Sequence, residues 1–126
     1  MKIASLIARL LMGLTFFVFG LNGFLRFIPA PPPTGLAGQF AGILFTSYLY
    51  VVIFAVQVIG GLLLLVNRFV PLALIILGPV IVNIFFFHLF MAPSGLPLAI
   101  VVVALWVIVA MRNKKYLAGI LTHRTE

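Results

Sequence analysis

Among the polar residues that interrupt the apolar stretches of this chain, five are its candidates for binding or chemistry: Asn22, Arg26, Gln57, Asn83 and His88. Amide, guanidinium and imidazole groups form hydrogen bonds, and of these only the imidazole titrates near neutral pH. Such a set suits the recognition of an oxygen-rich head group better than bond breaking. These five residues are therefore predicted to bind a ligand, and none of them is predicted to be catalytic.

Several kinds of catalytic site are excluded by the residues that the chain lacks. Its only acidic residue is Glu126, the last of 126, and it has no cysteine. A carboxylate metal site, a pair of catalytic carboxylates or thiol redox chemistry would need groups that are missing here. Only His88 could act as a general acid or base within the apolar stretches, because His123 lies in a polar tail. The sequence disfavours an enzyme and predicts neither a metal site nor a resident cofactor.

The elements that must position these residues are predicted to be membrane-spanning helices. The chain is 65% hydrophobic and only 7% charged, whereas about a quarter of the residues of a soluble domain are charged. Crossing a hydrocarbon core of about 30 Å takes about 20 helical residues, because lipid cannot satisfy exposed backbone groups. The prediction is an all-α, polytopic membrane protein with a single domain over 1–126, a four-transmembrane-helix bundle with spans at about 3–25, 48–66, 70–90 and 96–111.

A short additional helix is predicted between the first two spans. Prolines follow the first span at positions 29 and 31–33, and residues 36–45 then form an apolar helical stretch. If that helix ran unbroken to Val66, it would be about 45 Å long, which is too long to cross the membrane directly. A break at Thr46-Ser47 is therefore expected, and it leaves a short interfacial helix on the outer face.

The basic residues predict the orientation in the membrane. With four spans, seven Lys and Arg residues fall on the side of the two termini, and only Arg26 falls on the other side. Cytoplasmic segments carry the excess of Lys and Arg, so both termini are predicted to be cytoplasmic in a bacterial inner membrane. The net charge of +7 is read as this topology signal. The basic tail, 112–126, has no aromatic or groove-shaped context, so nucleic acid is not an expected partner.

Several short motifs occur in an order that is typical of one family. They are Phe19-Gly20-Leu21-Asn22-Gly23 before a proline-rich turn, Gly60-Gly61-Leu62-Leu63-Leu64-Leu65-Val66-Asn67-Arg68-Phe69-Val70-Pro71, Gly78-Pro79-Val80-Ile81-Val82-Asn83-Ile84 and Phe87-His88-Leu89. With these motifs the chain resembles the DoxX-like group of small bacterial four-helix membrane proteins over nearly its whole length.

This resemblance implies a four-helix bundle of the inner membrane. Some members are linked to redox systems, for instance as small membrane subunits of thiosulfate:quinone oxidoreductase. Close members often carry Glu where this chain has Gln57. A proton-transfer role therefore does not carry over to this position, because an amide forms hydrogen bonds but does not titrate.

The polar candidates are predicted to gather near the outer leaflet. Asn22 and Arg26 end the first span, Asn83 and His88 lie near the end of the third, and Gln57 could join them. A cationic patch without acidic residues, next to phenylalanines, suits a lipophilic ligand with an oxygen-rich or anionic head, such as a quinone or a lipid. The alternative is structural: Arg26 and His88 anchor helices at the head groups, and the amides join helices through hydrogen bonds.

Three geometric expectations follow for these residues. If the first spanning helix packs beside the third, Arg26 and His88 converge on one site, where Arg26 needs a partner other than a protein carboxylate. Asn83 and His88 lie about 140° apart around their helix, so they cannot both face one small pocket unless the bend at Gly78-Pro79 or a local unwinding turns them together. Gln57 is expected to be buried and hydrogen-bonded across helices, because hydrocarbon cannot satisfy an amide.

Two classes of function remain. The first is an integral membrane subunit or scaffold that binds a redox partner protein, with a quinone or lipid in the outer polar patch. The alternative is a small transporter or permease for a hydrophobic or weakly polar solute. The first is favoured, because transporters usually place ionisable groups or broken helices near the midplane, where this chain offers only Gln57 and the Gly78-Pro79 bend. Membrane lipids are expected contacts, and the sequence is compatible with an oligomer.

Overall fold

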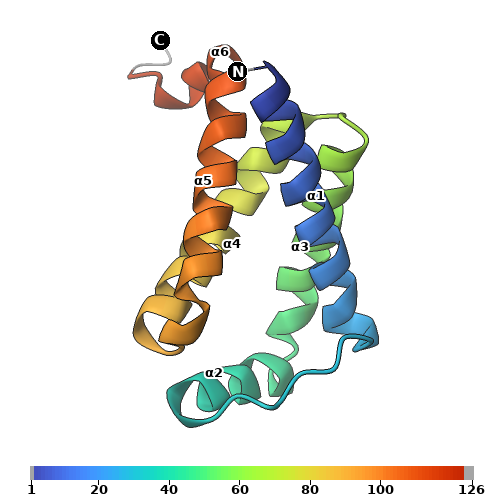
Figure 1. The fold of residues 1–126 in the computed structure, drawn as a ribbon, viewed down its shortest axis with the longest axis vertical. Coiled ribbons are helices and arrows are strands. Elements are labelled where there is room, and N and C mark those ends of the chain that lie inside the picture. Colours follow the sequence, from blue (N-terminus) through green and yellow to red (C-terminus); the bar gives the residue numbers. More distant parts are fainter. Residues whose placement is uncertain (1, 124–126) are drawn as a thin grey trace.

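The computed structural model describes residues 2–123, which form helices and connecting turns (Figure 1). Four long helices make a bundle: α1 (Lys2–Leu25), α3 (Leu49–Leu65), α4 (Val70–Phe90) and α5 (Leu96–Arg112). The shorter α2 (Gly35–Thr46) lies across one end of the bundle. The remaining elements are the 3-10 turn η1 (Pro93–Gly95), α6 (Lys114–Leu117) and the 3-10 turn η2 (Ala118–Leu121). Arg124 and Glu126, on which the predicted charge balance partly rests, lie outside the described residues.

The helix boundaries follow the breakers in the sequence. Each predicted span, and the predicted short helix, agrees with an observed helix to within one residue at each end. The predicted break at Thr46-Ser47 is confirmed, because α2 ends at Thr46 and α3 leaves it at 90°. Tyr48 takes a left-handed backbone conformation there, with φ of 63°. The Ser47 hydroxyl accepts a hydrogen bond of 3.3 Å from the Leu49 N–H, which stabilises the start of α3.

The bundle has the length and surface of a membrane protein. The segments Lys2–Leu25, Val70–Phe90 and Pro93–Arg112 are each long and apolar enough to cross a membrane, and α3 forms a bent pair with α2. With 17 residues, α3 alone is about 26 Å long. Large apolar side chains are exposed on all four long helices, for example Leu14, Val52, Val82 and Ile100. The protein is therefore an all-α, multi-pass membrane bundle whose outer surface contacts lipid.

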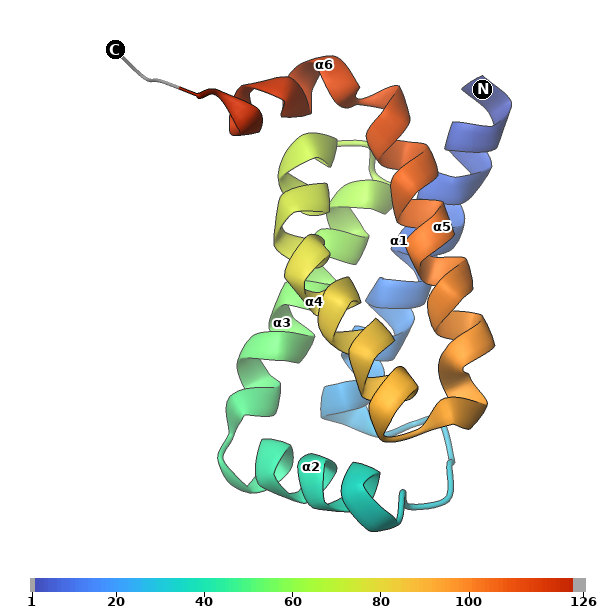
Figure 2. The ribbon, with the colours of Figure 1, turned by 90° about the vertical axis from the view of Figure 1, so that its left-hand side faces the viewer.

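The four long helices pack in a ring. α1 contacts α3 and α5, and α4 contacts the same two helices from the opposite side of the bundle. Figure 2 shows α4 in front of α1, which agrees with this order. The condition that the first spanning helix packs beside the third, which is α4, is therefore not met. The small-residue face of α1 packs on α3 instead.

Glycines bring the backbones of α1 and α3 into contact. A Cβ atom added at Gly61 would lie 2.5 Å from the Phe17 nitrogen and 2.8 Å from the Gly13 carbonyl oxygen. One added at Gly20 would lie 2.9 Å from the Val58 nitrogen. Small residues allow such an approach, and helix pairs in membranes are held by this kind of close packing. At Gly20 and Gly61, a side chain larger than hydrogen would therefore force the two helices apart.

Arg9 of α1 joins the same two helices at the end of their contact that lies away from α2. Its guanidinium donates a hydrogen bond to the carbonyl oxygen of Leu64, in the last turn of α3. The last four carbonyls of a helix lack partners within the helix, and a cation near them is favourable. Arg9 therefore stabilises the end of α3 as well as the α1–α3 contact.

The packed core occupies the half of the bundle away from α2. Its largest fully buried side chains are Met12, Leu64, Leu74, Leu77 and Val109. They come from the first half of α1, the end of α3, the start of α4 and the end of α5. Toward α2, the α1–α3 pair and the α4–α5 pair diverge (Figure 1). The bundle is therefore tightly packed at one end and less so at the other.

Candidate ligand-binding site

A cavity of about 450 Å³ lies between α2, α3 and α4, in the loosely packed half of the bundle. Small-molecule sites typically have volumes of about 300–1,000 Å³ and combine apolar walls with a few polar groups. This cavity has that composition, with three polar residues among twelve. Its lining residues are Phe40, Ala41, Leu44, Leu49, Ile53, Phe54, Gln57, Val80, Asn83, Ile84, Phe87 and His88.

The cavity has a closed floor on the core side. A Cβ atom added at Gly60 would lie 2.7 Å from the Cγ atom of Leu77, so α3 and α4 are in tight contact there. Leu77 is fully buried. Gln57 and Val80 lie one turn beyond this contact, toward α2. They are therefore the deepest lining residues along their two helices.

Gln57 combines burial with an unpaired amide. Its side chain is 6% exposed, and its stem lies against α1, because a Cβ atom added at Gly20 would be 3.1 Å from the Gln57 Cβ. Within residues 2–123, the amide makes no hydrogen bond. No fully enclosed side-chain polar atom in that range lacks a partner, so the amide must open onto the cavity. Burial of Gln57 is confirmed, but the expected hydrogen bond across helices is not found.

Asn83 and His88 line the same cavity from α4. The Asn83 Nδ2 donates a hydrogen bond of 3.0 Å to the carbonyl oxygen of Pro79, one turn earlier. The His88 Nδ1 lies 2.8 Å from the carbonyl oxygen of Ile84. Since a carbonyl oxygen only accepts, Nδ1 carries the proton in this contact. The Nε2 edge of the ring packs against Gly95 of η1, where an added Cβ atom would lie 2.5 Å from Nε2. Both side chains are thus attached to their own helix instead of joining two helices.

The width of the cavity explains how both residues reach it. Val80, Ile84 and Phe87 mark the centre of the lining face of α4, while Asn83 and His88 lie at its two edges. At about 100° per residue these five positions cover about 140° of the helix. The angle between Asn83 and His88 was predicted to exclude a shared small pocket without a bend. The pocket is large enough for both residues to border it.

Asn22 and Arg26 do not line this cavity. The Asn22 side-chain oxygen accepts a hydrogen bond of 2.8 Å from the Ile28 N–H, and the Asn22 carbonyl accepts one of 2.8 Å from the Arg26 N–H. Asn22 therefore closes the turn after α1. The exposed Arg26 places its guanidinium carbon 5.1 Å from the centroid of the Phe45 ring, a cation–π contact with the end of α2. The predicted convergence of Arg26 and His88 required α1 to pack beside α4, and this condition is not met, because α1 packs on α3 and α5.

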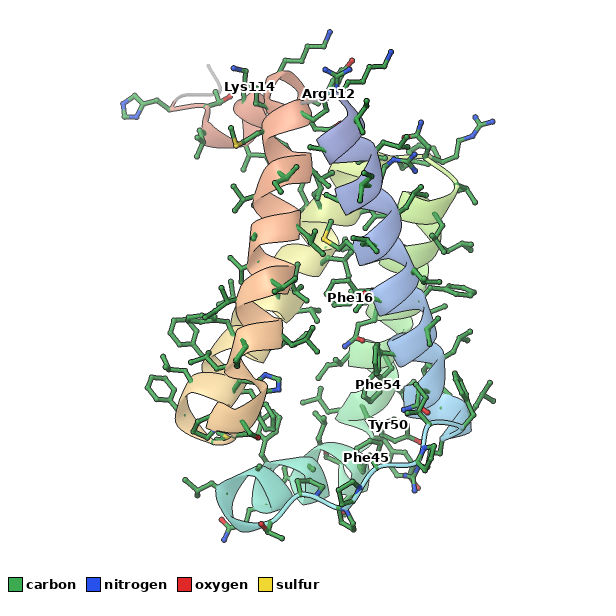
Figure 3. All side chains as sticks on the ribbon, viewed as in Figure 1. Phe16, Phe45, Tyr50, Phe54, Arg112 and Lys114 are labelled. Carbon is green, nitrogen blue, oxygen red and sulfur yellow. The ribbon has the colours of Figure 1, made fainter. Side chains whose placement is uncertain are left out.

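Aromatic rings form two walls that the sequence did not reveal. Phe40 of α2 meets Phe87 of α4 with ring centroids 5.4 Å apart. At the corner of α2 and α3, Phe45, Tyr50 and Phe54 form a cluster that Figure 3 labels. α2 is thus one wall of the cavity and not only a surface helix. The apolar residues Phe40, Ala41 and Leu44, on one face of a helix, were the available signal.

A second cavity, of about 360 Å³ between α4 and α5, lacks free polar groups. It is lined by apolar side chains and Gly78, together with Trp106. The Trp106 indole N–H already donates to the Leu74 carbonyl oxygen at 3.0 Å. Among residues 2–123 there is also no group of three or more His, Cys, Asp or Glu side chains that could bind a metal ion. The α2–α3–α4 cavity is therefore the better candidate site.

The fold and the site together define a class of protein: a membrane-spanning helical bundle with a largely apolar cavity that carries a few polar groups. The chain matches the DoxX family over residues 4–89 and belongs to that family, which confirms the resemblance seen in its motifs. The match covers α1 except for its first two residues, all of α2 and α3, and all but the last residue of α4, and so includes every residue that lines the cavity. No curated protein and no solved structure matches the chain.

Proposed function

We propose that this protein is a non-catalytic membrane subunit or scaffold whose α2–α3–α4 cavity binds a lipophilic ligand with an oxygen-bearing head, such as a quinone or a lipid. The observation that carries the proposal is the Gln57 amide, which opens onto a largely apolar cavity without a protein hydrogen-bond partner among the described residues. A hydrogen bond typically contributes about 0.5–1.5 kcal/mol net. A ligand head group that pairs with this amide gains that contribution. Association with a redox partner protein is supported by the resemblance to DoxX-like subunits.

Binding is a better reading of the cavity than transport. The Gly60–Leu77 contact and the buried core close it on the side away from α2. A transporter needs a path past its binding site, commonly along discontinuous helices near the midplane. The break in this fold lies between α2 and α3, at one end of the bundle.

The proposed site would be labelled by a photoactivatable ligand. A decyl benzoquinone and a phosphatidylglycerol, each with a diazirine on the acyl or alkyl chain, would be irradiated with the protein in lipid nanodiscs. Labelling should map to residues 49–57 and 80–88 by mass spectrometry, and the more efficient probe identifies the source of the head group. Val80→Phe, which fills the cavity, should weaken labelling by at least about tenfold, the effect of about 1.4 kcal/mol of lost binding.

Ile75→Phe is the matched control for this substitution. Ile75 is an exposed residue of α4 that lines neither cavity, so labelling should stay at the wild-type level. Equal labelling of the wild type and Val80→Phe, or labelling confined to the Arg26 turn, would contradict the proposed site.

The orientation in the membrane is also part of the proposal, with both termini in the cytoplasm of a bacterial cell. Its support is the distribution of charge over the two ends of the bundle. Arg112 and Lys114 lie at the end where α1 begins (Figure 3). Arg68, in the turn between α3 and α4, lies at that end as well, while Arg26 follows α1 at the α2 end. Cytoplasmic segments carry such an excess of basic residues.

Reporter fusions would test this orientation. Alkaline phosphatase is active only outside the cytoplasm, so a fusion after Glu126 should be inactive and one inserted within 31–34 should be active. A fluorescent protein that folds in the cytoplasm should give the reverse pattern at the same two sites. Phosphatase activity at the C-terminal site alone would overturn the orientation and place the cavity in the inner leaflet.

A further inference from the structure

The cavity offers more hydrogen-bond acceptors than donors. The Asn83 Nδ2 donates one of its two hydrogens to the Pro79 carbonyl, which leaves its second N–H and its Oδ1 free. The His88 Nδ1 is likewise bonded to the Ile84 carbonyl. Gln57 brings one free carbonyl oxygen and one free NH₂ group. Because each amide oxygen has two lone pairs, four acceptor positions compare with three free N–H hydrogens, and this imbalance favours a head group that can donate.

The cavity also lacks charge. Among the described residues that line it there is no Lys, Arg, Asp or Glu. Arg26, the cation that was predicted to share this site, lies over the Phe45 ring and outside the lining. Moving an anion out of water into such a site is costly without a paired charge. A phosphate head is therefore disfavoured inside the cavity.

Along the helix axes, the Gln57 and Asn83 amides lie less than one helical turn apart. α3 and α4 run antiparallel, and the Gly60–Leu77 contact sets their register. Counting three residues from Gly60 reaches Gln57, and six residues from Leu77 reach Asn83. Asn83 is therefore about 4.5 Å farther from the floor than Gln57, at 1.5 Å per residue. One ring-sized head group spans that separation.

From this arrangement we infer that Gln57 and Asn83 select an uncharged lipophile whose head bears a hydroxyl group, such as a phenol or hydroquinone, over its acceptor-only and anionic counterparts. This inference rests on the proposed function and specifies the chemistry of the ligand. The hydroxyl hydrogen is donated to a free amide oxygen, and the hydroxyl oxygen accepts from the Gln57 NH₂ group. The alkyl chain extends past the aromatic walls into the bilayer.

Three probes with the same decyl chain separate the possible head groups. They are 4-decylphenol, its methyl ether 4-decylanisole, and decyl phosphate. Each would compete against the photoactivatable quinone in nanodiscs, with its concentration expressed as a mole fraction of the lipid. The phenol should compete about tenfold better than the anisole, equivalent to about 1.4 kcal/mol, and decyl phosphate should be the weakest.

Two variants test whether this preference for the phenol arises in the cavity. Gln57→Leu should reduce the phenol-to-anisole ratio from about ten toward one, because it removes a free acceptor and a donor. Gln39→Leu makes the same chemical change at an exposed position of α2 outside the lining, and should leave the ratio unchanged. If neither variant changes the ratio, the preference arises elsewhere and the inference fails.

The remaining outcomes separate the inference from the proposed function. Equal competition by phenol and anisole would overturn the head-group inference and leave a cavity that binds lipophiles without selection. Strongest competition by decyl phosphate would overturn it in favour of an anionic head. If no probe competes, and the photoactivatable quinone does not label the lining segments, the proposed function itself is wrong.

Discussion

Gly61→Ala should lower the stability of the bundle, although alanine is the better helix former. The added Cβ would lie 2.5 Å from the Phe17 nitrogen, 2.8 Å from the Gly13 carbonyl oxygen and 3.0 Å from the Phe16 carbonyl carbon. All three atoms belong to the backbone of α1, so no side chain can rotate away. The helices must separate, and overpacking of this kind costs about 1–3 kcal/mol. Thermal unfolding in nanodiscs, followed by circular dichroism, would measure the loss.

Gly42→Ala is the control for this effect. Gly42 lies inside α2, and an added Cβ would meet nothing within 4 Å. Exchanging Gly for Ala in an open helical position is favourable by up to about 1 kcal/mol. Gly42→Ala should therefore melt at or above the wild-type temperature. If Gly61→Ala did so too, the close approach of α1 and α3 would not be a feature of the protein in membranes.

Helix boundaries were predictable from the sequence because prolines and membrane thickness fix them locally. The prolines after α1 and the length limit on α2 plus α3 place the breaks, and the helices agree with the predictions to within one residue. The order of packing was not predictable in the same way. α4 exposes Leu72 and Ile75 to lipid and buries Leu74 and Leu77, so apolar residues face both ways. Without a polar side, its sequence does not tell which helices are its neighbours.

For the candidate site too, features that depend on the local sequence were predictable, and features that depend on how distant helices pack were not. Gln57, Asn83 and His88 were chosen because polar side chains are costly in apolar spans, and the structure places all three at one cavity. Arg26 was grouped with them on leaflet depth alone. The depth of a residue in the membrane does not determine its position around the axis of the bundle. Arg26 lies over Phe45 instead of next to the cavity. The wall formed by α2 depends on a 90° bend whose direction the residues at Thr46-Ser47 do not encode.

Gln57→Leu should raise the stability of the unliganded protein by about 1 kcal/mol or less, because the amide makes no hydrogen bond within the described part of the chain but is not fully enclosed. The side chain is 6% exposed and has no partner within residues 2–123, so leucine removes a cost and loses no protein hydrogen bond. The expectation based on sequence was the opposite, because it assumed a bond across helices. Unfolding in ligand-free nanodiscs would measure the change.

Two further measurements complete this test: the melting temperature of Gln39→Leu, and the melting temperatures of the wild type and Gln57→Leu with ligand present. At the exposed Gln39 the same exchange removes no buried polar group, so the melting temperature should change little. With 4-decylphenol present, the wild type should gain stability and Gln57→Leu should gain less, because a ligand stabilises only the state that binds it. A residue that costs stability in the empty protein and repays it with ligand is typical of a binding site. A lower melting temperature for unliganded Gln57→Leu would instead show that Gln57 joins helices, and would remove the main support for the cavity as a site.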